Sequence, residues 1–337
     1  MFKRIFVPLD GSTRAEQSIP VAARLARASK GSVMLAQVTD IPILYESYGA
    51  SLYTEEVVDA QIKEVEDYLK TMVQSPLLEG VKVETSTLFG ATAQTLLSMS
   101  AMFKADLVVM TSQGKTGMKR WVLGSVAQKI ARHSPIPVLV IHEAGAVPVG
   151  PRPDSSPLRA LVTLDGSVLA KVALEPAAQL LAALSPDTPG VLHLLRIVKT
   201  PPLNVKENDP QSIAHMQDQA LQKAKMYMRS IVEHLHAGPI GKLKLAITWS
   251  VTLNDDVAET IMRVAEGGED AEGAGMPGRC DIIAMATHGR TGLQHWVLGS
   301  VTERVLSATR LPMLIVRPEE TAFQTASEEK VVAPHAL

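Results

Sequence analysis

The sequence predicts an α/β protein built from two tandem domains, each with a mainly parallel β-sheet. Three observations lead to this prediction. The segment from Thr111 to Val126 returns from Ala286 to Val301, 175 positions later, and both copies contain Trp-Val-Leu-Gly-Ser-Val. In each half, short runs rich in Val, Ile and Leu alternate with amphipathic stretches. The 337 residues also suit two domains of roughly 100–200 residues each.

The first half begins with an apolar strand, Arg4–Leu9, after which Ser12 or Thr13 caps a helix that runs to Ser29. A second strand over 33–38 precedes a loop rich in Tyr, Ser and Gly between Tyr45 and Tyr53. A long helix follows over 55–73, because apolar side chains recur there at spacings of three and four: Val58, Ile62, Val65 and Leu69.

Alternating residues predict a third strand over 81–88, followed by a helix over 92–102 and a buried strand over 105–110. A Gly-rich loop then leads to a helix over 125–132 and a last strand over 137–141. The second half repeats this order, with strands near 159–164, 191–198, 243–249, 281–285 and 312–316. Near-continuous aliphatic strands that alternate with helices predict a parallel sheet covered on both faces.

The repeat also sets the domain boundaries. Val7–Ser12 matches Val162–Ser167 at an offset of 155, and Ser134–Ile141 matches Thr309–Val316 at an offset of 175. A period this long indicates duplicated domains, not a solenoid with units of about 20–50 residues. We therefore expect a first domain over 1–145, a Pro-rich linker over 146–157 and a second domain over 158–320. The Gly-rich, acidic stretch 266–279 is expected to be a mobile loop, and 321–337 a disordered tail.

Composition argues against several classes of function. The formal charge is −2, with 15 basic and 14 acidic residues in 1–150 and 18 basic and 21 acidic residues in the remainder. Neither half has the basic excess that drives nucleic-acid binding. No run approaches the ~20 apolar residues of a membrane span. The start, Met1–Pro8, enters a strand directly and lacks a signal sequence, so we expect a cytoplasmic protein. The single cysteine, Cys280, is expected to be a buried small hydrophobic residue.

The ends of the first and fourth strands carry the candidate chemistry. Ligands of open parallel sheets bind beyond the carboxyl ends of the strands, where the winding reverses. Asp10 and Asp165 end the first strands and can accept hydrogen bonds from ribose hydroxyls, or instead form an Asx turn or helix cap. Gly114 and Gly289 let the backbone approach a phosphate.

A helix start completes each candidate site. Gly124-Ser125 and Gly299-Ser300 precede a predicted helix, whose free N–H groups and dipole favour an anion. The serine hydroxyls either donate to a phosphate or cap the helix. Other motifs do not fit: Val109 occupies the first glycine position of a P-loop, no G-x-G-x-x-G follows a strand, and the nine histidines show no metal-ligand spacing. We identify no catalytic residue and no metal ligand.

The pattern G-x2-G-x9-G-[ST] after an Asp-terminated first strand resembles the signature of the universal stress protein family, present here twice over about 2–142 and 158–318. The resemblance implies two tandem five-stranded parallel α/β sandwiches, Rossmann-like and of the adenine-nucleotide alpha-hydrolase-like type. It implies ATP as the ligand, with Mg²⁺ or Mn²⁺ held by the phosphates. It also implies self-association through the last strand, Val138–Ile141 or Leu314–Val316, which the two halves of one chain can satisfy internally or two chains as a homodimer.

The resemblance also implies a role for each matching position. The first motif position, Thr111 or Ala286, lies against the ribose, and the second, Gly114 or Gly289, meets the phosphates. The distal phosphates lie at Gly124-Ser125-Val126 or Gly299-Ser300-Val301. The adenine lies by the backbone of Val38 or Ile197, with Pro8 or Thr163 flanking it.

Both halves depart from the family pattern at the first glycine. Ala286 adds one methyl group, whereas Thr111 is β-branched and either crowds the ribose or contributes a hydroxyl to it. Lys115 and Arg290 lie inside the motif and either neutralise phosphate charge or remain solvated. The sequence therefore predicts two unequal ATP sites, of which the C-terminal site is the stronger.

The function predicted from these residues is that of a nucleotide-dependent stress-response regulator. Asp10 and Asp165 are the only candidates for a general base or metal ligand, so rapid turnover is not expected. Slow ATP hydrolysis or self-phosphorylation is one alternative. A nucleotide-independent scaffold is another, and Thr111 is the residue that favours it.

Overall fold

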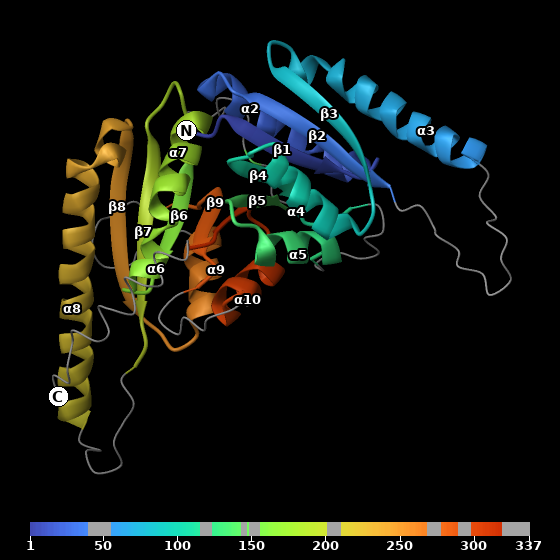
Figure 1. Ribbon diagram of the computed structural model, residues 1–337. Coiled ribbons are helices and arrows are strands. Elements are labelled where there is room, and N and C mark those ends of the chain that lie inside the picture. Colours follow the sequence, from blue (N-terminus) through green and yellow to red (C-terminus); the bar gives the residue numbers. More distant parts are fainter. Residues whose placement is uncertain are drawn as a thin grey trace, which may run out of the picture. The chain divides into compact units, whose positions relative to one another are not determined.

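The computed structural model describes residues 1–39, 55–114, 123–142, 147, 156–200, 210–267, 278–288 and 298–318 (Figure 1). The chain divides into two compact units, Met1–Val149 and Gly150–Leu337. This division falls inside the stretch 146–157 that we expected to be a linker. The predicted loop at 45–53, most of the loop at 266–279 and the tail at 321–337 lie outside the described residues.

The first unit contains a five-stranded parallel sheet. Its strands are β1 (Arg4–Leu9), β2 (Ser32–Thr39), β3 (Lys82–Phe89), β4 (Leu107–Thr111) and β5 (Val138–Ile141). They lie in the order β3-β2-β1-β4-β5, and every pair is parallel. The predicted α/β fold with a parallel sheet is therefore confirmed. The winding reverses between β1 and β4, where ligands of such sheets bind.

Helices cover both faces of this sheet (Figure 1). They are α1 (Thr13–Glu16), α2 (Ser18–Ser29), α3 (Glu55–Val73), α4 (Thr92–Met102) and α5 (Ser125–His133), with a 3₁₀ turn at Pro76–Leu78. Right-handed crossovers place α2 and α3 on one face, and α4 and α5 on the other. The core between these layers is aliphatic: the side chains of Ile5, Val7 and Leu107 are fully buried.

The second unit repeats this arrangement. Its strands are β6 (Arg159–Leu164), β7 (Gly190–Val198), β8 (Leu245–Leu253), β9 (Ile282–Ala286) and β10 (Met313–Val316), in the order β10-β9-β6-β7-β8. Its helices are α6 (Val168–Lys171), α7 (Leu174–Leu184), α8 (Pro210–Ala237), α9 (Val257–Gly267) and α10 (Ser300–Ala308), with a 3₁₀ turn at Pro239–Lys242. β6 therefore occupies the place of β1, and β9 the place of β4.

The first helix of each unit is not continuous, which corrects the predicted helix from Ser12 or Thr13 to Ser29. Ser12 caps α1, and the helix then breaks at Gln17 before α2 begins at Ser18. Pro20 lies in the first turn of α2, where its missing N–H is tolerated; in one continuous helix its ring would clash with the carbonyl of Glu16. Pro176 holds the same place in α7.

The third strand of the second unit is longer than predicted. The sequence pattern ended it near residue 249, but β8 continues to Leu253 because β7 pairs with it along its whole length, as far as Val198↔Leu253. Cys280 is buried as expected, and burial, followed by the nearby Asp281, raises the pKa of its thiol to about 12. Across the described ranges, no helix combines the length and the apolar character needed to cross a membrane.

Candidate nucleotide-binding site

Asp10 and Gly114 meet at the carboxyl edge of the first sheet. Asp10 follows β1, and Gly114 lies three residues beyond the end of β4. A Cβ atom added to Gly114 would overlap the carboxylate of Asp10, and Oδ2 is the nearest atom. Only glycine therefore fits beside this carboxylate without a shift. The two elements that the sequence predicted at one edge are brought together.

One oxygen of each aspartate has a structural role. Asp10 Oδ1 accepts hydrogen bonds from the Ser12 amide (3.1 Å) and the Ser12 hydroxyl (2.6 Å). Asp165 Oδ1 accepts the same pair from Ser167, at 2.9 and 2.6 Å. The Asx turn, which the sequence offered as an alternative role for the aspartates, is therefore present in both units. It uses Oδ1, whereas the atom of Asp10 that faces Gly114 is Oδ2.

The residue after each aspartate requires glycine for its backbone conformation. Gly11 has φ +78° and Gly166 has φ +89°, in the left-handed region that glycine adopts without strain. The next residue, Ser12 or Ser167, accepts a hydrogen bond from the amide of Ala15 or Ala170 and so caps α1 or α6. These two turns hold the aspartates in the same geometry in both units.

The two ends of the Gly-rich loop are fixed to each other. In the first unit the Gly124 amide donates to the Ser112 carbonyl at 2.7 Å, and the Ser112 amide donates to Ile141 at 2.8 Å. In the second unit the Gly299 amide donates to Thr287 at 2.7 Å, and the Thr287 amide donates to Val316 at 2.8 Å. The intervening residues 115–122 and 289–297 lie outside the described residues, including the predicted Lys115, Gly289 and Arg290.

The first motif position differs between the units, as the sequence indicated. The Thr111 hydroxyl donates to the carbonyl of Gln113 at 2.9 Å, so its proton is directed into its own loop. Ala286 is buried, and its carbonyl accepts a hydrogen bond from the Thr302 hydroxyl at 2.9 Å. A ribose that contacted Thr111 would therefore meet an oxygen whose proton is already donated.

Both predicted helix starts are present, but the serines do not cap them. Gly124 and Gly299 are the N-cap residues of α5 and α10, so Ser125 and Ser300 are the first helical residues and do not cap. Both serines are exposed. The first-turn amides of these helices, which include Val126 and Val301, have no partner within the helix and are oriented for an anion.

The residues expected around the adenine also lie at this edge. Pro8 of β1 is opposite Ala36, and Val38 lies two residues further along β2. Thr163 of β6 is opposite Leu195, and Ile197 lies two residues further along β7. Pro8 is buried, while Val38, Thr163 and Ile197 are half-buried. Their contact with adenine stays a prediction.

A tyrosine at matched positions of α3 and α8, Tyr68 and Tyr227, was not among the residues predicted from the sequence. Tyr68 of α3 donates from its hydroxyl to Glu16 Oε1 at 3.2 Å. Burial, the charge of Glu16 and the charge of Asp10 together raise the pKa of Tyr68, so its phenol stays protonated. In the second unit, the Tyr227 ring of α8 lies beside two cations, Lys171 and Arg196. The sequence did contain a sign of this difference, because Glu16 in the first unit is matched by Lys171 in the second.

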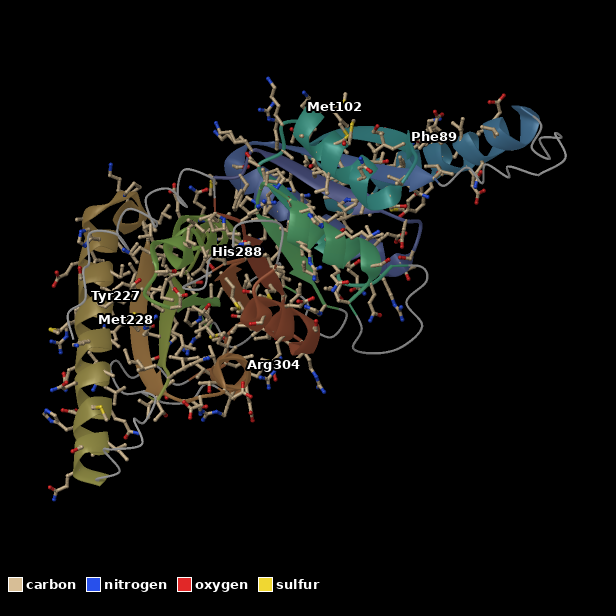
Figure 2. The ribbon with its side chains drawn as sticks, turned by 60° about the horizontal axis from the view of Figure 1, so that its bottom comes forward. Phe89, Met102, Tyr227, Met228, His288 and Arg304 are labelled. Atoms are coloured by element: carbon tan, nitrogen blue, oxygen red, sulfur yellow. The ribbon has the colours of Figure 1, made fainter. Side chains whose placement is uncertain are left out.

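A histidine lies at the loop of the second unit (Figure 2). His288 directly precedes Gly289, and its Nδ1 is 2.9 Å from the Thr287 hydroxyl oxygen. Burial, followed by the charge of Arg317, lowers the pKa of His288. The imidazole is therefore neutral at pH 7. It occupies the position that Gln113 has in the first unit.

The sequence pattern that defines the Universal stress protein family matches residues 1–142 and, a second time, 158–317. The chain belongs to this family. It is similar to universal stress protein Slr1230 of Synechocystis, with 26% identity over 94% of this chain and 100% of that protein. It is also similar to universal stress protein MJ0531 of Methanocaldococcus jannaschii, with 30% identity over 42% of this chain and 82% of that protein.

Solved structures agree on the fold. A universal stress protein from Archaeoglobus fulgidus superposes with a TM-score of 0.61 and 18% identity, covering 94% of this chain and 97% of that one. A putative universal stress protein from Pseudomonas aeruginosa gives a TM-score of 0.57 and 16% identity, with 98% of each chain covered. The two family matches make the chain a tandem member of the family, and these structures agree with its fold.

Proposed function

We propose that this universal stress protein binds ATP in each unit and acts as a nucleotide-dependent stress-response regulator. The observation that carries the proposal is the contact of Asp10 with Gly114. It places a carboxylate that can accept from ribose hydroxyls beside a backbone that lacks a side chain, at the edge where β1 and β4 diverge.

The helix starts supply the second half of the proposed site. The amides at the start of α5 and α10 lie next to the loop that follows β4 and β9, because Gly124 and Gly299 are bonded to Ser112 and Thr287. An anion at these positions is favoured by the helix dipole and by the unpaired first-turn amides. A Mg²⁺ or Mn²⁺ ion would be held by the phosphates of the nucleotide.

The geometry supports a regulator over a rapid enzyme. Asp10 Oδ1 and Asp165 Oδ1 already accept two hydrogen bonds each from a serine, so each carboxylate is held in one orientation by its own turn. A general base must reach the proton that it removes. In the proposed complex Asp10 and Asp165 accept hydrogen bonds from ribose hydroxyls and do not act as a general base. Slow hydrolysis or self-phosphorylation is the second candidate.

Equilibrium binding of ATP, ADP and AMP to the purified chain tests the proposal. We expect Gly114→Val to abolish binding at the N-terminal site, because its side chain overlaps Asp10, and Gly289→Val to abolish binding at the C-terminal site. Gly267→Val is the matched control, since the space around an added Cβ is open there. Wild-type protein that binds none of the three nucleotides would favour the nucleotide-independent scaffold.

A phosphate-release assay on the same purified protein distinguishes a regulator from an enzyme. With ATP in excess, we expect phosphate release of at most about one equivalent per site over the assay. Sustained multiple turnover that Asp10→Asn or Asp165→Asn abolishes would favour the enzymatic alternative. Self-association through the last strands, within one chain or between two copies, and a cytoplasmic location remain predictions from the sequence.

A further inference from the structure

A buried arginine lies under the proposed ribose end of the second unit. Arg196 of β7 is only 6% exposed, and its Nη1 donates to the Leu164 carbonyl at 3.3 Å. Its guanidinium carbon is 5.8 Å from the centre of the Tyr227 ring, and Lys171 Nζ is also 5.8 Å from that centre. Figure 2 shows Tyr227 on α8, the helix beside β7 and β8.

The guanidinium of Arg196 lies against the turn that presents Asp165. Leu164, whose carbonyl it binds, precedes Asp165 in the chain, and Gly166 follows. A Cβ atom added to Gly166 would be 2.9 Å from Arg196 Nη2 and 3.0 Å from Nη1. Positive charge is therefore placed on the same turn as the carboxylate proposed to contact the ribose.

The first unit has the same framework with different charges. Leu9 is opposite Gln37 in β2, just as Leu164 is opposite Arg196 in β7. Glu16 ends α1, just as Lys171 ends α6. In the first unit the three matched positions hold two carboxylates and one amide: Asp10, Glu16 and Gln37. In the second unit they hold one carboxylate and two cations: Asp165, Lys171 and Arg196.

The three matched positions therefore differ by three formal charges, −2 against +1, at equivalent places in two homologous sites. Charges in partly buried sites are screened less by salt than charges on open surface. Guanidinium groups also suit phosphate, because they donate several N–H bonds from one planar group. These charges would favour an additional anionic group near the ribose in the second site and disfavour it in the first.

We propose that the C-terminal site selects adenine nucleotides that carry a further phosphate on the ribose, at the 2′ or 3′ position, with Arg196 and Lys171 as the specificity-determining residues. One ribose hydroxyl remains to contact Asp165. The N-terminal site, with Glu16 and Gln37, takes the nucleotide without this phosphate. This inference rests on the proposed adenine-nucleotide binding and names the ligand class of one of its two sites.

Calorimetric titration of the full chain with three probes tests the inference: AMP, adenosine 2′,5′-bisphosphate and adenosine 3′,5′-bisphosphate. A Gly114→Val background leaves the C-terminal site as the one measured. We expect one bisphosphate to bind roughly tenfold more tightly than AMP, which corresponds to about 1.4 kcal/mol. We expect this preference to shrink as NaCl is raised.

Two variants assign the preference to the two cations. Arg196→Gln installs the side chain type found in the first unit and should remove the preference, measured as the ratio of bisphosphate to AMP affinity within the same variant. Lys171→Glu should reverse the preference without altering a buried group. Lys242→Gln is the control: it removes a positive charge from an exposed residue at the amino end of β8, away from the carboxyl edge. Hydrogen exchange of β6 and β7 checks that each variant is folded.

The outcomes separate this inference from the proposal on which it rests. AMP binding with equal affinity for all three probes would overturn the ribose-phosphate inference alone. A preference that persists in both Arg196→Gln and Lys171→Glu would overturn the assignment to these residues. Failure of every adenine nucleotide to bind would overturn the inference together with the proposed function.

Discussion

At the scale of single residues, the two N-cap glycines, Gly124 and Gly299, are needed for the structure of the loop and not only for binding a ligand. A Cβ added to Gly124 would lie 3.1 Å from the Ser112 carbonyl oxygen, and one added to Gly299 would lie 2.8 Å from the Thr287 carbonyl oxygen. The same carbonyls accept the hydrogen bonds that close the loops. The glycines therefore serve loop closure as well as any approach of a phosphate.

We expect Gly299→Ala to be more destabilising than Gly124→Ala. A separation of 2.8 Å forces the Thr287 backbone to move, whereas 3.1 Å needs a shift of a few tenths of an ångström. Overpacking of this kind costs roughly 1–3 kcal/mol. Hydrogen-exchange mass spectrometry on the intact chain measures local opening of α5 and α10 separately. Equal protection of the two helices in the two variants would contradict this ranking.

At the scale of secondary-structure elements, a histidine links two strands of the second unit. His193 of β7 lies between two hydroxyls of β8, with Nδ1 2.8 Å from Thr248 Oγ1 and Nε2 2.8 Å from Ser250 Oγ. Burial, followed by the charge of Arg159, lowers the pKa of His193 to about 4. The folded state therefore holds this imidazole neutral below the pH at which it titrates in an unfolded chain.

This shift predicts a loss of stability in acid. The folded pKa of His193, about 4, is below its ordinary value of 6.5, so the unfolded state binds the proton first. The contribution is complete above about pH 6.5 and is lost as the pH falls towards 4, by roughly 3 kcal/mol at about 1.4 kcal/mol per pKa unit. Burial lowers the pKa of His142 to about 4 as well, so the first unit is expected to show the same trend.

Urea unfolding at pH 7.5 and pH 5 measures this effect. His193→Gln should be less stable than wild type at pH 7.5 and should lose less stability on transfer to pH 5. His234→Gln, an exposed change on α8, is the control and should behave like wild type. If His193→Gln loses as much stability as wild type between the two pH values, the buried imidazole is not the source of the acid sensitivity.

The elements also show where sequence reasoning succeeds and where it fails. Aliphatic runs such as Leu107–Met110 are buried, so most strands were predicted to within one or two residues at each end. The break at Gln17 was missed although Pro20, inside the predicted helix, is incompatible with one continuous helix and marks the start of a second one. The end of β8 depended on pairing with β7, which no local pattern reveals.

Part of the candidate site could likewise be predicted from the sequence, and part could not. The meeting of Asp10 and Gly114 could be predicted, because the carboxyl ends of parallel strands share one edge. The environment of Arg196 could not, because it depends on contacts among β7, α6 and α8 that are distant in sequence. Comparison of Glu16 with Lys171 at matched repeat positions would have given the first sign of it.

At the scale of the whole molecule, duplication has kept the framework and changed the contacts. Both units have the same strand order, the same Asx turn and the same closure of the Gly-rich loop. They differ at Thr111 and Ala286 and in the charges beside Tyr68 and Tyr227. The two proposed nucleotide sites are therefore similar in framework and unequal in properties.

The number of ATP molecules bound per chain tests this claim most directly. Native mass spectrometry and calorimetry of the wild type should show two bound ATP molecules with distinct affinities, the tighter one in the second unit. Asp165→Asn, which keeps an oxygen for the Ser167 turn, should weaken only the tighter event, and Asp10→Asn only the weaker one. No bound ATP, or unchanged binding in both variants, would contradict the account.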